Sequence, residues 1–235
     1  MTTLPDYPHA LVPDTWLAAA LGRPSFRLEP RDDAPANANP PPGRAFAYAK
    51  LAAGEIERLN LLLAGGWRLA EVAVELARGR APEPAPPDGI RFADDADRGA
   101  IGDIAAVAFT QNRFHLDPEI GPEGCGRVKR AWTDAFFSGG RGSHMIVADE
   151  AGAAAGFLQA ILKDGRLTID LIAVDSAHQG RGVGRRLVAF ALGAIPGWRE
   201  ARVQTQLHNA ASIALYQAQG FALARAGYTL HAHWR

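Results

Sequence analysis

The sequence predicts a mixed α/β fold in which helices cover both faces of one sheet. Runs with apolar residues at every second position, typical of half-buried strands, alternate along the chain with runs of helical period. Gly, Asn and Asp separate these runs, as expected at turns and helix ends. After residue 89 the predicted order is β α α β β β α β α β. This order gives both parallel and antiparallel neighbours, and therefore a mixed sheet.

The elements after residue 89 follow from their period and from signals at their ends. Acidic residues open the first helix, and Asn209 and Gly220 are placed as the N-cap and the stop of the last helix. The last segment reads as one strand or two. The predicted strands are 90–93, 143–150, 153–162, 166–174, 201–208 and 221–234, and the predicted helices are 95–109, 124–137, 182–195 and 209–219.

A proline-rich segment divides the chain. The stretch GRAPEPAPPDG, residues 79–89, holds four prolines between glycines and cannot lie inside a helix or a central strand. We therefore expect a smaller N-terminal unit over 1–80, a linker over 81–88 and a larger C-terminal domain over 89–235. A second loose stretch, residues 30–44, predicts a long surface loop within the N-terminal unit.

Part of the N-terminal unit repeats the plan of the end of the chain. Residues 45–76 read as strand, helix, Gly66–Trp67 and strand, and residues 201–234 read as strand, helix, Gly220–Phe221 and strand. We interpret the first copy as a degenerate partial domain that packs beside the main one. The alternative is chance similarity, because the β-α-β plan is common.

Composition limits the classes of function. The 25 basic residues, of which only three are lysines, balance 25 acidic ones, so no basic excess indicates a nucleic-acid partner. No apolar run approaches the ~18 residues of a membrane span, and the N-terminus lacks the charged and apolar regions of a signal peptide. A single cysteine excludes an intrachain disulfide. We therefore expect a cytoplasmic protein that binds neither nucleic acid nor membrane.

The most informative segment is the turn Gln179-Gly180-Arg181-Gly182-Val183-Gly184, between a predicted strand and a helix. Glycines let the backbone turn tightly, and the free amides and dipole of a helix start suit a pyrophosphate. Arg181 and Arg185 add charged donors. A Walker loop would continue with Lys-Ser or Lys-Thr where Arg185 stands, and a dinucleotide fingerprint would have a third glycine in place of Leu187. The remaining alternative is a helix start with incidental glycines.

Two motifs together resemble the GNAT superfamily of N-acetyltransferases. Gln-x-x-Gly-x-Gly after a strand ending in Leu-Ile-Ala-Val resembles its acetyl-CoA signature, and Asn209, Tyr216 and Gly220–Phe221 resemble its second signature. The resemblance covers roughly residues 89–235. It implies a GNAT acyl-CoA N-acyltransferase fold, with the N-terminal unit as a partial GNAT-like domain. The residues that it implies for acetyl-CoA are Ile172, Ala173 and Val174 for pantetheine, Gln179, Gly180, Arg181, Gly182, Val183, Gly184 and Arg185 for pyrophosphate, and Asn209 at the next helix.

A shorter loop has a more specific resemblance. Residues 111–118, Gln-Asn-Arg-Phe-His-Leu-Asp-Pro, are similar to a loop in bacterial dTDP-fucosamine N-acetyltransferases, which acetylate the amine of a nucleotide-linked deoxysugar. The resemblance implies a dTDP amino sugar as the acceptor, dTDP-4-amino-4,6-dideoxygalactose being that of the family. Arg113, Phe114 and His115 are then candidates for the phosphates and the flat base. The alternative is that Phe114 fills the core and Arg113 is solvated.

Acetyl transfer to an amine needs no enzyme nucleophile, because the amine attacks the thioester itself. A backbone N–H near Ile172 or Val174 is expected to stabilise the oxyanion. Tyr216 is the expected general acid for the leaving thiolate, a role that the resemblance also implies. Asp170, two residues before Ile172 and on its face, is the candidate base, acting directly or through water. A salt-bridged or solvated Asp170, a water relay and His115 are the alternatives.

Other readings of the sequence remain open. His231 and His233 share a strand face, but no third ligand is evident, so we expect no metal site. The acceptor can instead be an antibiotic amine or a protein N-terminus, and a non-catalytic acyl-CoA-binding module is the candidate from another class. Exposed C-terminal strands make a homodimer possible.

Overall fold

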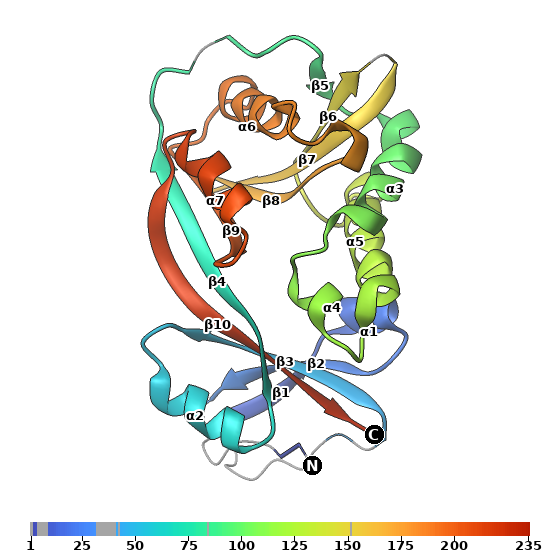
Figure 1. Ribbon diagram of the computed structural model, residues 1–235, viewed down its shortest axis with the longest axis vertical. Coiled ribbons are helices and arrows are strands. Elements are labelled where there is room, and N and C mark those ends of the chain that lie inside the picture. The colour runs from blue at the N-terminus through green and yellow to red at the C-terminus, as the bar shows by residue number, and fades with distance from the viewer. Residues whose placement is uncertain (1, 4–8, 32–40, 42, 84, 151) are drawn as a thin grey trace.

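The computed structural model describes residues 2–3, 9–31, 41, 43–83, 85–150 and 152–235. Within these residues, ten strands form a single mixed sheet in the order β1-β2-β3-β10-β4-β9-β8-β7-β6-β5 (Figure 1). Helices lie on both of its faces, so the predicted fold class is confirmed. None of the helices in this described part of the chain has the length and apolar character needed to cross a lipid bilayer.

Every element predicted after residue 89 is present, with small shifts at the ends. A capping box at Asp94 opens a 3₁₀ turn, Asp95–Asp97, ahead of the first helix. The residues expected to form a loop near 111–118 include one short helix. The elements are β5 (Ile90–Phe92), α3 (Arg98–Ala108), α4 (Arg113–Leu116), α5 (Gly121–Phe137), β6 (His144–Glu150), β7 (Ala153–Lys163), β8 (Arg166–Val174), α6 (Val183–Ala194), β9 (Glu200–Gln206), α7 (Ala210–Gln217) and β10 (Ala222–Trp234).

The N-terminal part holds three elements that the sequence did not predict. They are β1 (His9–Pro13), α1 (Thr15–Leu21) and β2 (Ser25–Pro30), each too short for a clear period. The predicted strand, helix and strand are confirmed as β3 (Ala45–Ala52), α2 (Ile56–Ala64) and β4 (Arg68–Gly79). Most of the expected loop at 30–44 lies outside the described residues. The described linker residues, 81–83 and 85–88, form neither helix nor strand.

The two similar segments are interleaved in the sheet. Strand β10 lies between β3 and β4, and β4 pairs with β9, so each segment gives its last strand to the other (Figure 1). Both helices end alike, because Trp67 N–H donates to Leu62 O at 3.0 Å and Phe221 N–H donates to Tyr216 O at 3.1 Å. Leu62 therefore occupies in the first segment the place of Tyr216 in the second. The division of the chain into two units at 81–88 stays a prediction. Strands from both sides of this segment belong to one sheet.

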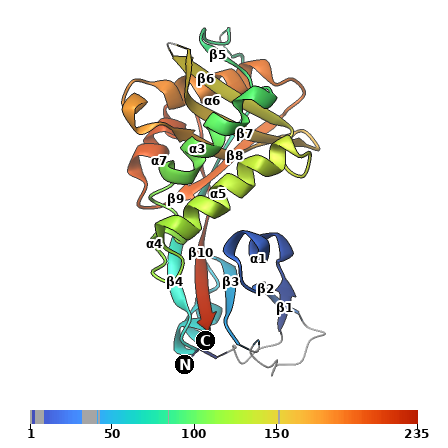
Figure 2. The same ribbon diagram turned by 90° about the vertical axis from the view of Figure 1, so that its right-hand side faces the viewer.

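The middle of the sheet opens between two parallel strands. Strands β8 and β9 pair only from Arg166↔Glu200 to Ile169↔Val203, although both continue further. At the same point the register between β7 and β8 shifts, which leaves Asp170 as the extra residue of a bulge. Helices α6 and α7 cover one face of this region and α3 and α5 the other (Figure 2). The strands therefore separate in the centre of the fold, where the chain can admit a ligand.

Candidate active site

A cavity of about 880 Å³ fills the opening between β8 and β9. The start of α6, the start of α7 and the loop between α3 and α4 complete its walls. His208 after β9 contacts the carbonyl oxygen of Gln111 through Nε2 at 3.0 Å, which links two of the lining loops. Its volume lies within the usual range for ligand sites, about 300–1,000 Å³. We therefore take this cavity as the candidate active site.

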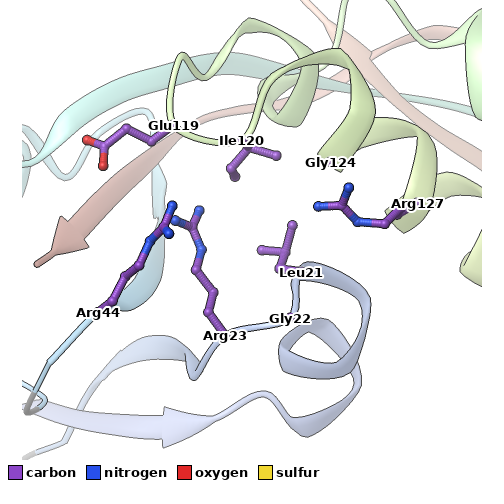
Figure 3. A pocket seen from close by; sticks show the side chains of 8 residues that line it. All are labelled: Leu21, Gly22, Arg23, Arg44, Glu119, Ile120, Gly124 and Arg127. Carbon is purple, nitrogen blue, oxygen red and sulfur yellow. The ribbon is translucent and has the colours of Figure 1, made fainter.

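A second hollow, of about 230 Å³, lies between α1 and the start of α5 (Figure 3). Arg23 and Arg44 lie side by side there, and Arg127 points in from α5. Its volume is below the usual range for ligand sites. The second hollow is therefore too small for a coenzyme.

The Gly-rich turn forms one end of the large cavity. Gly180 and Gly182 have φ values of 76° and 77°, a left-handed conformation that favours glycine. Gly182 is the N-cap of α6, and no side chain caps the first amides of that helix. Gln179 closes the turn by donating from Nε2 to the carbonyl oxygen of Val174 at 3.2 Å. The turn thus presents free N–H groups and the positive end of a helix dipole at the cavity wall, which suits an anion.

Most residues predicted to hold acetyl-CoA line this cavity. Arg181 is the exception, since it is exposed and lies off the cavity wall. Asn209 caps α7 by accepting from the N–H of Ser212 at 3.1 Å, as predicted. The predicted residues on the wall are Ile172, Ala173, Val174, Gln179, Gly180, Gly182, Val183, Gly184, Arg185 and Asn209. Their contacts with a coenzyme stay predictions.

Tyr216 lines the cavity from α7. Its ring is 2% exposed and packs edge-on against Phe221, with 5.8 Å between the centroids. No hydrogen bond within the described residues involves its hydroxyl group. Burial raises the pKa of Tyr216 well above its usual value, so the phenol stays protonated at neutral pH. A protonated, unengaged hydroxyl at the wall can donate to a ligand.

Asp170 also lines the cavity, but its carboxylate is already engaged. Arg141 holds both oxygens at 2.7 Å, Trp132 donates from Nε1 at 2.9 Å and Gln159 donates from Nε2 at 3.3 Å. The salt-bridged alternative is therefore the state in the structure. The expectation that Asp170 shares a face with Ile172 is wrong, because the bulge turns Asp170 toward α5 while Ile172 packs on the α6 side. Its role as a base stays a prediction.

The predicted acceptor residues on α4 do not line the cavity. Phe114 is 3% exposed and lies in the core. The guanidinium of Arg113 stacks on the rings of Phe114 and Tyr48, at 4.1 and 4.7 Å, and donates to Nε2 of His231 at 2.8 Å. Arg113 is thus half-buried, packed and paired, and not simply solvated. For Arg113, Phe114 and His115, acceptor binding stays a prediction without a cavity contact, whereas Gln111 and Asn112 just before them line the wall.

The expectation that His231 and His233 lack a third ligand is wrong. One oxygen of Asp117 lies 2.5 Å from Nδ1 of His231 and 2.9 Å from Nε2 of His233, so the three residues form a possible metal cluster. Arg113 can only donate, so Nε2 of His231 must accept and Nδ1 must carry the proton that goes to Asp117. A metal on Nδ1 would place a proton on Nε2, facing Arg113. The donor pattern therefore fits a hydrogen-bonded cluster better than a metal site.

The titration of these groups agrees with that arrangement. Burial lowers the pKa of His231 to about 4, although Asp117 opposes the shift, so the ring is neutral at pH 7. Burial raises the pKa of Asp117, but hydrogen bonds from the two histidines outweigh it and hold the pKa well below its usual value. An ionised carboxylate between two ring N–H donors is the resulting state.

Lys129 is the cavity residue that sequence reasoning missed. It lies on α5, is 7% exposed, and forms part of the wall near Asp170. Its ammonium lies 4.5 Å from the ring centroids of both Phe109 and Trp132. Burial lowers its pKa to about 8. The available signal was its identity, since it is one of only three lysines in an arginine-rich chain.

A model of the acetyltransferase (GNAT) family matches residues 107–221. The matched segment is just under half of the chain. The matched segment contains the Gly-rich turn, Asn209 and Tyr216, which carried the resemblance in the sequence. The prediction of an acetyltransferase enzyme thus agrees with the family of the matched segment.

Known proteins give further comparisons. The chain is 29% identical over 140 residues to the spore coat polysaccharide biosynthesis protein SpsD of Bacillus subtilis (strain 168), with 59% of this chain and 48% of SpsD aligned. It thus spans about half the length of that relative. A GCN5-related N-acetyltransferase from Sphaerobacter thermophilus has a TM-score of 0.57 at 18% identity, covering 83% of this chain and 61% of the other. A tandem GNAT protein from the clavulanic acid biosynthesis pathway has a TM-score of 0.54 at 16% identity, covering 89% and 75%. The two structures show the same GNAT fold.

Proposed function

We propose that this GNAT enzyme transfers the acetyl group of acetyl-CoA to the primary amine of a nucleotide-linked amino sugar. The observation that carries the proposal is the cavity of about 880 Å³, which has an uncapped helix start suited to an anion at one end and Tyr216 in its wall. Such a cavity can hold a diphosphate, a thioester and a proton donor in one continuous space.

The coenzyme is proposed to lie along β8. Its pyrophosphate is held by the first amides of α6, and Arg185 on the same wall adds a cation. Beyond Ile169 the edge of β8 that faces β9 pairs with no strand of the described residues, so its backbone is available to pair with pantetheine as an added strand. The N–H of Ile172 or Val174 then points at the thioester oxygen and stabilises the oxyanion.

The chemistry follows from these positions. The neutral amine attacks the thioester carbon, and a tetrahedral intermediate forms with its oxyanion on the β8 amide. The C–S bond then breaks, and Tyr216 donates its proton to the departing thiolate. Because burial raises the pKa of Tyr216, the phenol is protonated at neutral pH and carries the proton that this step needs.

The sugar acceptor rests on two observations of different kinds. Residues 111–118 resemble a loop of dTDP-fucosamine N-acetyltransferases, and Gln111 and Asn112 of that loop line the cavity. The relative SpsD is described as a polysaccharide biosynthesis protein. Both support an amino sugar, and the loop favours a dTDP-linked one.

The N-terminal unit is proposed to be a degenerate copy that completes the sheet. Its helix α2 carries Leu62 where α7 carries Tyr216, so this copy lacks a phenol at the corresponding position. It supplies β4, which pairs with β9 on the side away from β8. We infer that the first segment supports the site and does no acetyl transfer of its own.

Two measurements test the function separately. Calorimetry should show that acetyl-CoA binds, and that binding is lost when substitutions in the Gly-rich turn displace its amides. Release of free thiol is then measured with each class of acceptor in turn. The nucleotide sugars are dTDP- and UDP-linked amino sugars, and aminoglycosides and peptides are the alternative acceptors. Turnover with a nucleotide amino sugar alone supports the proposal. Binding with turnover only on aminoglycosides or peptides refutes the sugar acceptor, and the absence of binding refutes the coenzyme site.

A further inference from the structure

We propose that Lys129 is the general base that removes the proton from the acceptor ammonium. The proposal rests on the proposed function, because it assigns a residue to the same cavity. It differs from the sequence-based expectation, which placed the base at Asp170.

The first argument is position. Lys129 and Asp170 both line the cavity, and Trp132 of α5 packs against the first and donates to the second. Asp170 lies four residues before Val174 on β8, a distance of about 13 Å along a strand. Lys129 therefore belongs to the half of the cavity away from the pyrophosphate turn. In that half the acetyl end of an extended coenzyme would meet the amine.

The second argument is that the ammonium group lacks an acceptor. In the described part of the chain, Nζ makes no hydrogen bond and no ion pair, and its contacts are the ring faces of Phe109 and Trp132. The nearby Asp170 is held by Arg141 instead. Placing an ammonium without a protein acceptor on a side chain that is only 7% exposed is unfavourable, which promotes loss of its proton.

The groups around Lys129 act in both directions. Burial is the largest influence and lowers the pKa of Lys129 to about 8, and the charge of Arg113 on α4 lowers it further. Cys125 on α5, Glu71 on β4 and Asp170 on β8 raise it. With a pKa of about 8, roughly 10% of Lys129 is neutral at pH 7. A neutral amine is therefore present at neutral pH to accept a proton.

The proton balance closes without another reactant. Neutral Lys129 takes a proton from the acceptor R–NH₃⁺, and the resulting R–NH₂ attacks the thioester. The N–C bond forms and the C–S bond breaks, with the second amine proton released to water. Tyr216 protonates the thiolate and regains its proton from solvent, and Lys129 returns its own. The net reaction converts R–NH₃⁺ and acetyl-CoA to the amide, the free thiol and one proton released to solvent.

A charged Lys129 that anchors an anionic part of the acceptor is the rival role. The surroundings disfavour the anchor, because the faces of the two aromatic rings beside the ammonium carry negative potential and do not attract a phosphate. The rival remains distinguishable, since arginine keeps a cation but cannot act as a base at pH 7.

The experiment measures kcat/KM for thiol release from pH 6 to 9.5, with the amino sugar that the wild type turns over best. Lys129→Met and Lys129→Arg should both lose activity by at least about 100-fold. Both should also lose the rising limb near pH 8 and bind acetyl-CoA as the wild type does. Lys163→Met, at an exposed lysine on β7, is the matched control and should behave as the wild type. Retention of activity by Lys129→Arg would establish the anchor and overturn the base, and retention by Lys129→Met would overturn both.

A second measurement does not depend on turnover. With only three lysines, Lys50, Lys129 and Lys163, carbon-13 labelled lysine gives three signals, and Lys129→Met identifies one of them. That signal should titrate near pH 8 in the complex with coenzyme A. Titration above pH 10 would overturn the base role even if no acceptor were found, whereas a failed acceptor screen with titration near pH 8 would refute only the sugar assignment.

Discussion

Replacing Gly182 with alanine should weaken acetyl-CoA binding about 5- to 30-fold. Gly182 has a φ of 77°, and no atom lies within 4 Å of the position that its Cβ would take, so the substitution causes strain but no clash. A left-handed conformation costs a residue with a Cβ about 1–2 kcal/mol. The variant relieves this strain by relaxing the turn. The coenzyme must then restore it, and 1.4 kcal/mol corresponds to about a tenfold change in Kd.

The assay is titration calorimetry with acetyl-CoA, and two other glycines serve as controls. Gly197→Ala introduces the same strain at a φ of 82°, again without a clash and away from the cavity, so it should lower stability but leave Kd unchanged. Gly184→Ala places a Cβ 3.4 Å from Leu215 at an ordinary φ, and Kd should change less than threefold. Equal Kd values for Gly182→Ala and the wild type would refute the idea that this turn conformation binds the diphosphate.

Three further predictions concern other groups. Tyr216→Phe removes only a hydroxyl that has no partner among the described residues, so Tm and acetyl-CoA affinity should change little. Because the proposed proton donor is lost, kcat should fall on the order of 10²- to 10⁴-fold. An unchanged kcat would remove Tyr216 from the mechanism. Asp170→Asn should reduce kcat/KM less than about tenfold, because Arg141 already holds the carboxylate, and a loss of 100-fold with the pH limb abolished would return the base role to Asp170. The third concerns His231, whose pKa is lowered from 6.5 to about 4 in the folded state, so the unfolded chain binds its proton first as the pH falls. Stability should therefore decrease between about pH 6.5 and 4, by on the order of 3 kcal/mol, in urea unfolding at a series of pH values. His231→Gln should lose less over this range, and an equal loss would place the titrating group elsewhere.

Features set by neighbouring residues were predictable from the sequence. The Gly-rich turn was predictable because a left-handed backbone favours glycine. The start of the following helix has no side-chain cap, as expected for a turn with free amides. The cap of α7 at Asn209 was as well, since a short polar side chain satisfies the first free amides of a helix. The strands after residue 89 were found because their alternation reports which face is buried.

Features that depend on distant pairings were not. The direction of Asp170 depends on a bulge that exists only through pairing with β7, and an assumed regular strand puts its side chain on the wrong face. The placement of β10 between β3 and β4 joins segments far apart in the chain, and nothing local distinguishes it from pairing with β9. The pKa values of Lys129 and His231 were not predictable either, because burial by distant elements lowers them.

By itself, the sequence determined the resemblance to the GNAT family, the turn proposed to bind the coenzyme and the position of Tyr216, because short motifs encode them. Only the tertiary structure decided which side chains face the cavity. It packed Arg113 and Phe114 into a core with His231 and enclosed Lys129 between two aromatic rings. The physical reason is that burial and charge around a side chain come from elements brought together by folding, and a linear pattern carries no record of them.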